Sequence, residues 1–156
     1  MSKAIEGKFE VPQGRILVLS SRFNQMVTDS LVLGATEVLQ RQGVLESDID
    51  VVKVPGAFEL PIVCQKILRS RNYAGVVALG AVIRGETGHY DFVAGGANQG
   101  LMQVSLNENV PITFGILTCD TVEQALNRAG LCVGNKGGEA AQALVEILSV
   151  IRQVGE

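Results

Sequence analysis

The chain has 156 residues, which is enough for one domain with its own core. Its net charge is −3 and its 13 basic residues form no run, which argues against a nucleic-acid partner. Hydrophobic residues make up 47% of the chain and charged residues only 19%. We therefore expect either a core that is large for this length or apolar surface buried against other copies.

The sequence predicts a cytoplasmic protein that contacts no membrane. Residues 1–14 contain no apolar segment of the kind a secretory signal needs, and the longest apolar run, residues 74–83, is about half of a membrane span. Cys64, Cys119 and Cys132 are odd in number and far apart, so we interpret them as reduced, buried thiols. With a single histidine and no cysteine cluster, we expect no metal site.

Four apolar, strand-like runs recur along the chain after an N-terminal arm. Residues 1–14 carry Gly7, Pro12 and Gly14 and are predicted to be extended, with a neighbouring subunit's sheet edge as one candidate place for them. The strand-like runs then cover residues 15–20, 50–56, 75–83 and 111–119. They are almost continuously hydrophobic, which is typical of strands buried on both faces of a parallel sheet.

A helical pattern follows each run. The expected helices cover residues 29–42, 59–71, about 90–107, 121–130 and about 138–154. In the fourth, Asp120 and Glu123 have the spacing of a capping box, and Gly130 is a natural stop. Alternating strands and helices predict a single α/β domain over residues 1–156, a flavodoxin-like three-layer sandwich whose four-stranded parallel sheet is flanked by helices.

In such folds, ligands bind beyond the carboxyl ends of the strands, and four unusual side chains follow those ends. Phe23 follows the first strand, Phe58 and Glu59 follow the second, and His89 follows the third. An imidazole there is suited to proton transfer near neutral pH, although a lone histidine is often only a solvated surface residue. The aromatic rings would be poorly buried unless a flat ligand or a crossing loop covered them.

Two glycine-rich turns precede helices and are candidate anion sites. The turn at residues 85–89 contains Thr87, and the turn at residues 129–139 contains Lys136 with Arg128 just before it. Each has a plainer interpretation, as a tight bend or as a solvated charge at a helix end.

Considered together, these stretches resemble a known enzyme family. "RFN", "VPGAFELP", "GAVIRGETGHYDFV", "FGILT" and "AGLCVGNKGGEAA" occur in this order between about residues 15 and 150. They resemble the signature stretches of the 6,7-dimethyl-8-ribityllumazine synthases, which catalyse the penultimate step of riboflavin biosynthesis. The resemblance implies a transferase without a cofactor. It would condense 5-amino-6-(D-ribitylamino)uracil with 3,4-dihydroxy-2-butanone 4-phosphate to form 6,7-dimethyl-8-ribityllumazine.

The resemblance also implies roles for individual residues. The proton shuttle would be His89. The ribitylaminouracil would be bound by Phe23, Ala57, Phe58, Glu59, Ala81, Val82, Ile83 and Phe114. The butanone phosphate would be bound by Glu86, Thr87, Arg128 and Lys136. Phe114 and Arg128 would come from the adjacent subunit.

The same resemblance implies a homopentamer with active sites shared between neighbours. The turn at residues 129–137 has the short form found in family members that build icosahedral shells, so we expect twelve pentamers in a shell, with riboflavin synthase as a candidate partner. Two alternatives stay open at this point. One is a flavodoxin-like module that binds a flavin or a lumazine, and the other is a non-catalytic shell protein.

Overall fold

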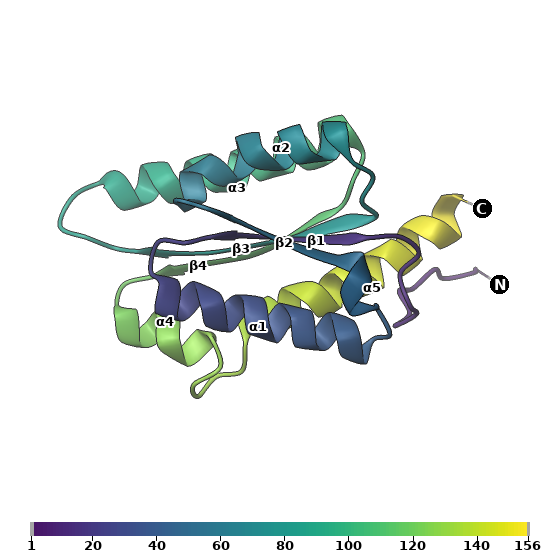
Figure 1. Ribbon diagram of the computed structural model, residues 1–156, viewed down its shortest axis with the longest axis horizontal. Helices are drawn as coiled ribbons and strands as arrows, with labels where there is room; N and C mark the ends of the chain where they lie inside the picture. The colour runs from purple at the N-terminus through teal and green to yellow at the C-terminus, as the bar shows by residue number, and fades with distance from the viewer. Residues whose placement is uncertain (1, 156) are drawn as a thin grey trace.

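The computed structural model describes residues 2–155 and shows one twisted sheet between two layers of helices (Figure 1). The sheet contains β1 (Ile16–Ser21), β2 (Ile49–Val54), β3 (Gly75–Ile83) and β4 (Ile112–Cys119). All pairings are parallel and the strand order is β2-β1-β3-β4. This confirms the predicted flavodoxin-like α/β fold, in which the order of the strands reverses next to β1.

Helices cover both faces of the sheet (Figure 1). One face carries α2 (Leu60–Ser70) and α3 (His89–Glu108), and the other carries α1 (Gln25–Arg41), α4 (Val122–Arg128) and α5 (Lys136–Gly155). Two short 3-10 helices, η1 (Glu46–Asp48) and η2 (Ala57–Glu59), flank β2. Within residues 2–155, no helix combines the length and the apolar character that a membrane crossing requires.

The core consists of two apolar layers separated by the sheet, because successive strand side chains point to opposite faces. In β1, Ile16 and Val18 pack toward α1 and α5, whereas Leu17 and Leu19 pack toward α2 and α3. All four side chains are fully buried. The continuous hydrophobicity of the predicted strands therefore has the expected cause, since the inner strands are covered on both sides.

The starts of α1 and α4 differ from the sequence-based expectation. Helix α1 begins at Gln25 rather than at Asp29, directly after Asn24, whose backbone is left-handed with a φ of 62°. The predicted capping box at Asp120 is wrong, because the side chain of Thr121 caps α4 by accepting a hydrogen bond from the amide of Gln124. Gly130 follows the end of α4 with a φ of +111°, a conformation that favours glycine, so the predicted stop is confirmed.

Helices α1 and α5 approach each other closely at two glycines. A Cβ atom on Gly137 would lie 2.1 Å from the carbonyl oxygen of Leu31, so only glycine fits there. Gly138 also lies in this contact and faces the backbone of Gly34. The expected start of α5 at residue 138 is therefore too late, because the glycines belong to the helix and permit its contact with α1.

The N-terminal arm runs along α5 of its own chain. The amide of Lys8 donates to Ser149 Oγ over 3.1 Å, and Gln153 Nε2 donates to the carbonyl oxygen of Glu6 over 2.8 Å. Glu10 forms an ion pair with Arg152. The predicted placement of the arm on a neighbouring subunit stays a prediction.

At the amino ends of the strands, Asp50 joins three strands through its carboxylate. Arg15, just before β1, donates from Nη2 to Asp50 Oδ1 over 2.7 Å and from Nε to Oδ2 over 3.3 Å. The hydroxyl of Tyr73, just before β3, donates to Oδ2 over 2.6 Å. The pKa of Asp50 lies below its ordinary value. The largest cause is the hydrogen bond from Arg15, and the next is the hydrogen bond from Tyr73.

We expect Asp50→Asn to be less stable than the unmutated protein at neutral pH. The difference in the free energy of unfolding should become smaller as the pH falls. Because the folded-state pKa of Asp50 lies below the unfolded value of about 3.9, the carboxylate stabilises the fold fully above that pH. This contribution disappears as the pH falls through the lower folded-state pKa. The measurement is the free energy of unfolding of both proteins in denaturant at several pH values. A difference that widens toward low pH would contradict this assignment.

Candidate functional site

The carboxyl ends of β1, β2 and β3 surround a pocket of about 620 Å³, which we call the aromatic pocket. The loop after β3 and the first turns of α3 also line this pocket. Its predicted members are Phe23, Ala57, Phe58, Glu59, Ala81, Val82, Ile83, Thr87 and His89. The structure therefore brings together most of the residues that the sequence placed at one end of the sheet.

Backbone hydrogen bonds hold Phe23 at this end of the sheet. The amides of Arg22 and Phe23 donate to the carbonyl oxygens of Val54 and Pro55 over 2.7 and 3.0 Å, which ties the exit of β1 to the exit of β2. Asn24 Nδ2 adds a longer hydrogen bond of 3.4 Å to the carbonyl oxygen of Ala81 in β3. The position of the Phe23 ring at the rim is thus set by the three neighbouring strands.

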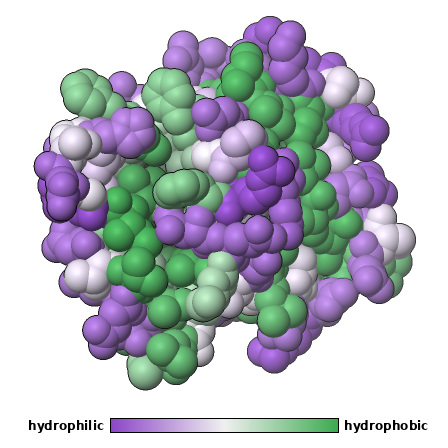
Figure 2. All heavy atoms as spheres, turned by 60° about the vertical axis from the view of Figure 1, so that its left-hand side comes forward, coloured by the Kyte–Doolittle hydropathy of each residue, from purple (hydrophilic) through white to green (hydrophobic). Residues whose placement is uncertain are grey.

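Aromatic side chains in this pocket are open to solvent. Phe23 is 72% exposed, Phe58 is 60% exposed and Phe92 is 77% exposed. The side of the molecule that carries the loop after β3 shows broad hydrophobic areas beside hydrophilic residues (Figure 2). Rings left uncovered at the end of a sheet favour a flat ligand that stacks on them.

His89 is the first residue of α3 and lines the aromatic pocket. The helix begins without a side-chain cap at Gly88, and the amide of His89 makes only a long contact of 3.4 Å with Thr87 Oγ1. The amide donors of this first turn are therefore oriented for an anion. Glu86, which was predicted to bind phosphate with Thr87, is exposed in the same loop but does not line the pocket.

The sequence did not single out Tyr90, Phe92 and Val93, which also line the aromatic pocket. Arg84 stacks on the ring of Tyr90 with its guanidinium carbon 4.4 Å from the ring centroid. Arg84 Nε also pairs with Asp120 over 3.0 Å, which ties the loop after β3 to the end of β4. The available signal was helical spacing, because Val93 lies four residues after His89 and three after Tyr90 and so shares a helix face with each.

A second pocket, of about 470 Å³, lies along the open edge of β4, and we call it the cationic pocket. Phe114, Arg128 and Lys136 line it together with Glu139. Arg128 Nη1 donates to the carbonyl oxygen of Gln124 over 3.2 Å, and Lys136 Nζ pairs with Glu139 over 2.8 Å. Two cations in one hollow form a suitable site for a phosphate group.

The aromatic and cationic pockets share no lining residue. Within one chain, the structure therefore does not bring Phe114, Arg128 and Lys136 together with Phe23 and His89.

None of the three cysteines lines the aromatic or the cationic pocket. Cys64 and Cys119 are buried as predicted, but Cys132 is exposed, which corrects that part of the prediction. It belongs to the loop between α4 and α5, where Leu131 and Val133 are exposed as well. Burial raises the pKa of Cys64 to about 12, so this thiol is not a nucleophile at neutral pH. For residues 2–155, no group of three or more potential metal ligands is found.

Comparison with known proteins agrees with this geometry. Residues 13–152 match the family described as 6,7-dimethyl-8-ribityllumazine synthase. A curated protein with that same description, from Nitratidesulfovibrio vulgaris (strain DSM 19637 / Miyazaki F), is 49% identical over 152 residues. The alignment covers 97% of this chain and 97% of the relative. The chain therefore belongs to the 6,7-dimethyl-8-ribityllumazine synthase family.

Proposed function

We propose that this chain condenses 5-amino-6-(D-ribitylamino)uracil with 3,4-dihydroxy-2-butanone 4-phosphate at a site built by two subunits. The product is 6,7-dimethyl-8-ribityllumazine, and the step belongs to riboflavin biosynthesis. Family membership and the 49% identical relative support the reaction. The observation that carries the arrangement is that the chain has two separate pockets, one aromatic and one cationic.

The aromatic pocket has the chemistry that a ribityl-pyrimidine needs. Phe23 offers an exposed ring for stacking on the pyrimidine, and Glu59 offers a carboxylate that accepts hydrogen bonds from the ribityl hydroxyls. Main-chain groups complete the binding surface in this proposal. Those of Ala57 and Phe58 hold the ribityl chain, and those of Ala81, Val82 and Ile83 contact the edge of the pyrimidine.

The phosphate of the second substrate needs donors and positive charge. The backbone amides of Glu86 and Thr87, the hydroxyl of Thr87 and the uncapped start of α3 supply donors on one side of the proposed site. Arg128 and Lys136 supply the charge, but within one chain they lie in the other pocket. We therefore infer that Phe114, Arg128 and Lys136 of a neighbouring copy complete each aromatic pocket.

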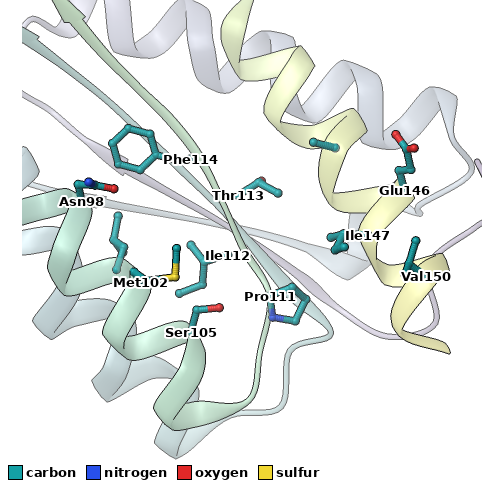
Figure 3. Close-up of a pocket in the computed structure, with 12 residues that line it drawn as sticks. Asn98, Met102, Ser105, Pro111, Ile112, Thr113, Phe114, Glu146, Ile147 and Val150 are labelled. Atoms are coloured by element: carbon teal, nitrogen blue, oxygen red, sulfur yellow. The ribbon is translucent and has the colours of Figure 1, made fainter. Parts of the chain in front are cut away.

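A groove at the edge of the sheet gives that neighbour a place to bind. Figure 3 shows it along β4, between Asn98, Met102 and Ser105 of α3 and Glu146, Ile147 and Val150 of α5. It measures about 500 Å³, and Phe114 lines both this groove and the cationic pocket. A head-to-tail contact at such an edge gives a ring when its rotation closes, and the proposed homopentamer is a ring of this kind.

We also propose a larger assembly of the pentamers and a cellular location. The short turn between α4 and α5 supports a shell of twelve pentamers. Riboflavin synthase is a proposed partner of this shell. A cytoplasmic location rests on three free cysteines, two of them buried. The two alternatives, a flavin- or lumazine-binding module and a non-catalytic shell protein, are not favoured by the family match.

The chemistry requires positioning more than strong catalytic groups. An amine of the pyrimidine attacks the butanone carbonyl and water leaves, which gives an imine. Phosphate then departs with the electrons of its C–O bond, and the second amine closes the ring with loss of another water. In this scheme His89 carries the protons, while Arg128 and Lys136 stabilise the departing phosphate. Holding two reactants together contributes up to about 7–11 kcal/mol in favourable cases.

We expect His89→Ala to slow turnover by no more than about 10²–10⁴-fold, the usual contribution of general acid–base catalysis. Binding of a ribityl-pyrimidine analogue should stay nearly unchanged, because stacking on Phe23 does not need the imidazole. Single-turnover kinetics and a binding titration measure the two effects. Complete loss of product with unchanged binding would mean that proton transfer, and not positioning, dominates.

Arg128→Ala should weaken binding of inorganic phosphate by about 1.5–3 kcal/mol, since it removes a charge-assisted hydrogen bond. A ribityl-pyrimidine analogue should lose far less, and Arg128→Lys should restore phosphate binding poorly. Titration calorimetry gives both affinities. Arg41→Ala is a matched control, because Arg41 is exposed at the far end of α1. Equal losses for both ligands would place Arg128 elsewhere.

The shared site is tested by mixing two variants of reduced activity. His89→Ala and Arg128→Ala chains are unfolded together in equal amounts and reassembled. With random neighbours, roughly one interface in four pairs an intact His89 with an intact Arg128, so activity should rise toward about a quarter of the unmutated enzyme. After verified subunit exchange, activity equal to the average of the two variants would show that both residues serve the same subunit.

A further inference from the structure

The side chain of Asn135 uses its whole hydrogen-bonding capacity inside the protein. Its Oδ1 atom accepts from the amides of Gly137 and Gly138 over 2.9 and 3.1 Å, which is the pattern of a helix N-cap. Its Nδ2 atom donates to the carbonyl oxygens of Ser30 and Ala129 over 2.9 and 3.2 Å. Both Nδ2 protons are thus engaged, and they make contacts that a helix cap does not require.

These four partners lie in three different segments. Ser30 belongs to α1, Ala129 follows the last residue of α4, and the two glycines form the first turn of α5. The main chain of Asn135 also forms an isolated antiparallel bridge with Ala129. One amide side chain therefore joins the end of α4 to the start of α5 and anchors both to α1.

The surrounding sequence makes room for this amide. A Cβ atom on Gly34 would lie within 2.3 to 2.5 Å of the terminal atoms of the Asn135 side chain, so α1 carries glycine where the amide lies against it. Alanine is otherwise the better residue inside a helix, by about 1 kcal/mol. The glycine in α1 is thus explained by the amide that packs on it.

Both cations of the cationic pocket are direct neighbours of these anchored positions. Arg128 precedes Ala129 in the chain, and Lys136 follows Asn135. In the pocket Glu139 pairs with Lys136, whereas Arg128 donates to the carbonyl oxygen of Gln124. Like charges repel at short range, and a fixed backbone is what keeps them on the same hollow before an anion arrives.

We propose that Asn135 is a positioning residue for phosphate binding, which fixes the backbones of Arg128 and Lys136 so that both cations face one anion. The inference rests on the proposed function, because it takes the cationic pocket as the phosphate site. Asn135 acts through the two cations and does not itself contact the substrate. The Nδ2 bonds to Ser30 and Ala129 are the part of its network that this role requires.

Three variants separate positioning from simple capping of α5. Asn135→Ala removes all four hydrogen bonds. Asn135→Ser keeps an N-cap oxygen for the amides of α5 but is too short and too poor in donors to reach Ser30 and Ala129 together. Gly34→Ala leaves Asn135 in place but drives its amide away from α1. Arg128→Ala serves as the reference for loss of the phosphate site.

The first measurement is the thermal midpoint of unfolding. The Kd of inorganic phosphate, by calorimetry, and the KM of each substrate are then measured well below that temperature. We expect Asn135→Ser to regain most of the midpoint lost in Asn135→Ala. Its phosphate Kd should still rise about tenfold or more, as a misplaced binding group would cause. KM should rise for the butanone phosphate and not for the pyrimidine. Gly34→Ala should weaken phosphate binding in the same way.

Two other results would overturn the inference, and they are distinguishable. If Arg128→Ala weakens phosphate binding but Asn135→Ser and Gly34→Ala bind phosphate as the unmutated protein does, Asn135 is only a cap. If the unmutated protein binds no phosphate, or Arg128→Ala binds it equally well, the proposed phosphate site itself is wrong. Should Asn135→Ala fail to fold, the serine and Gly34 variants still decide the question.

Discussion

Strand β4 has an open edge, and this edge leaves a single chain incomplete. In the order β2-β1-β3-β4, this strand pairs on one side only, so its other side presents unpaired backbone groups. The apolar groove and the cationic pocket both lie along that edge, and Phe114, 46% exposed, lines both. A single chain therefore leaves the apolar groove and the cationic pocket uncovered at the same place, and in the proposed assembly a second copy covers both.

The sequence was sufficient to predict the parts that depend on local pattern. Continuous apolar runs identified all four strands, and a parallel sheet places every strand exit at one edge, so Phe23, Glu59 and His89 were correctly expected together. Helix starts were less predictable. Asp120 has a good capping side chain, but the ion pair with Arg84 engages it, and Thr121 caps α4 instead. A local sequence pattern cannot show that a distant residue, here Arg84 in the loop after β3, forms an ion pair with the capping side chain.

Contacts between distant segments account for what the sequence could not predict. From the sequence, Gly137 was expected in a glycine-rich turn before the last helix. In the structure it lies inside α5, where it contacts Leu31, more than a hundred residues away. Asn135 likewise gave no signal of its own beyond the glycine-rich stretch around it. Its importance follows from Ser30 and Gly34 on α1, and only the folded chain brings these residues to its amide.

Separating the two pockets has a physical consequence for the enzyme. Most of the rate is expected from holding two substrates together, and the groups proposed to hold them lie in two separate pockets of one chain. In the proposed assembly, the contact that buries the edge of β4 is the same contact that brings the cations to the aromatic pocket. Stability and activity then depend on one interface, so both change together with protomer concentration. A well-fixed backbone at Arg128 and Lys136 matters more in such a site, because the partner chain must present both cations already in place when it docks.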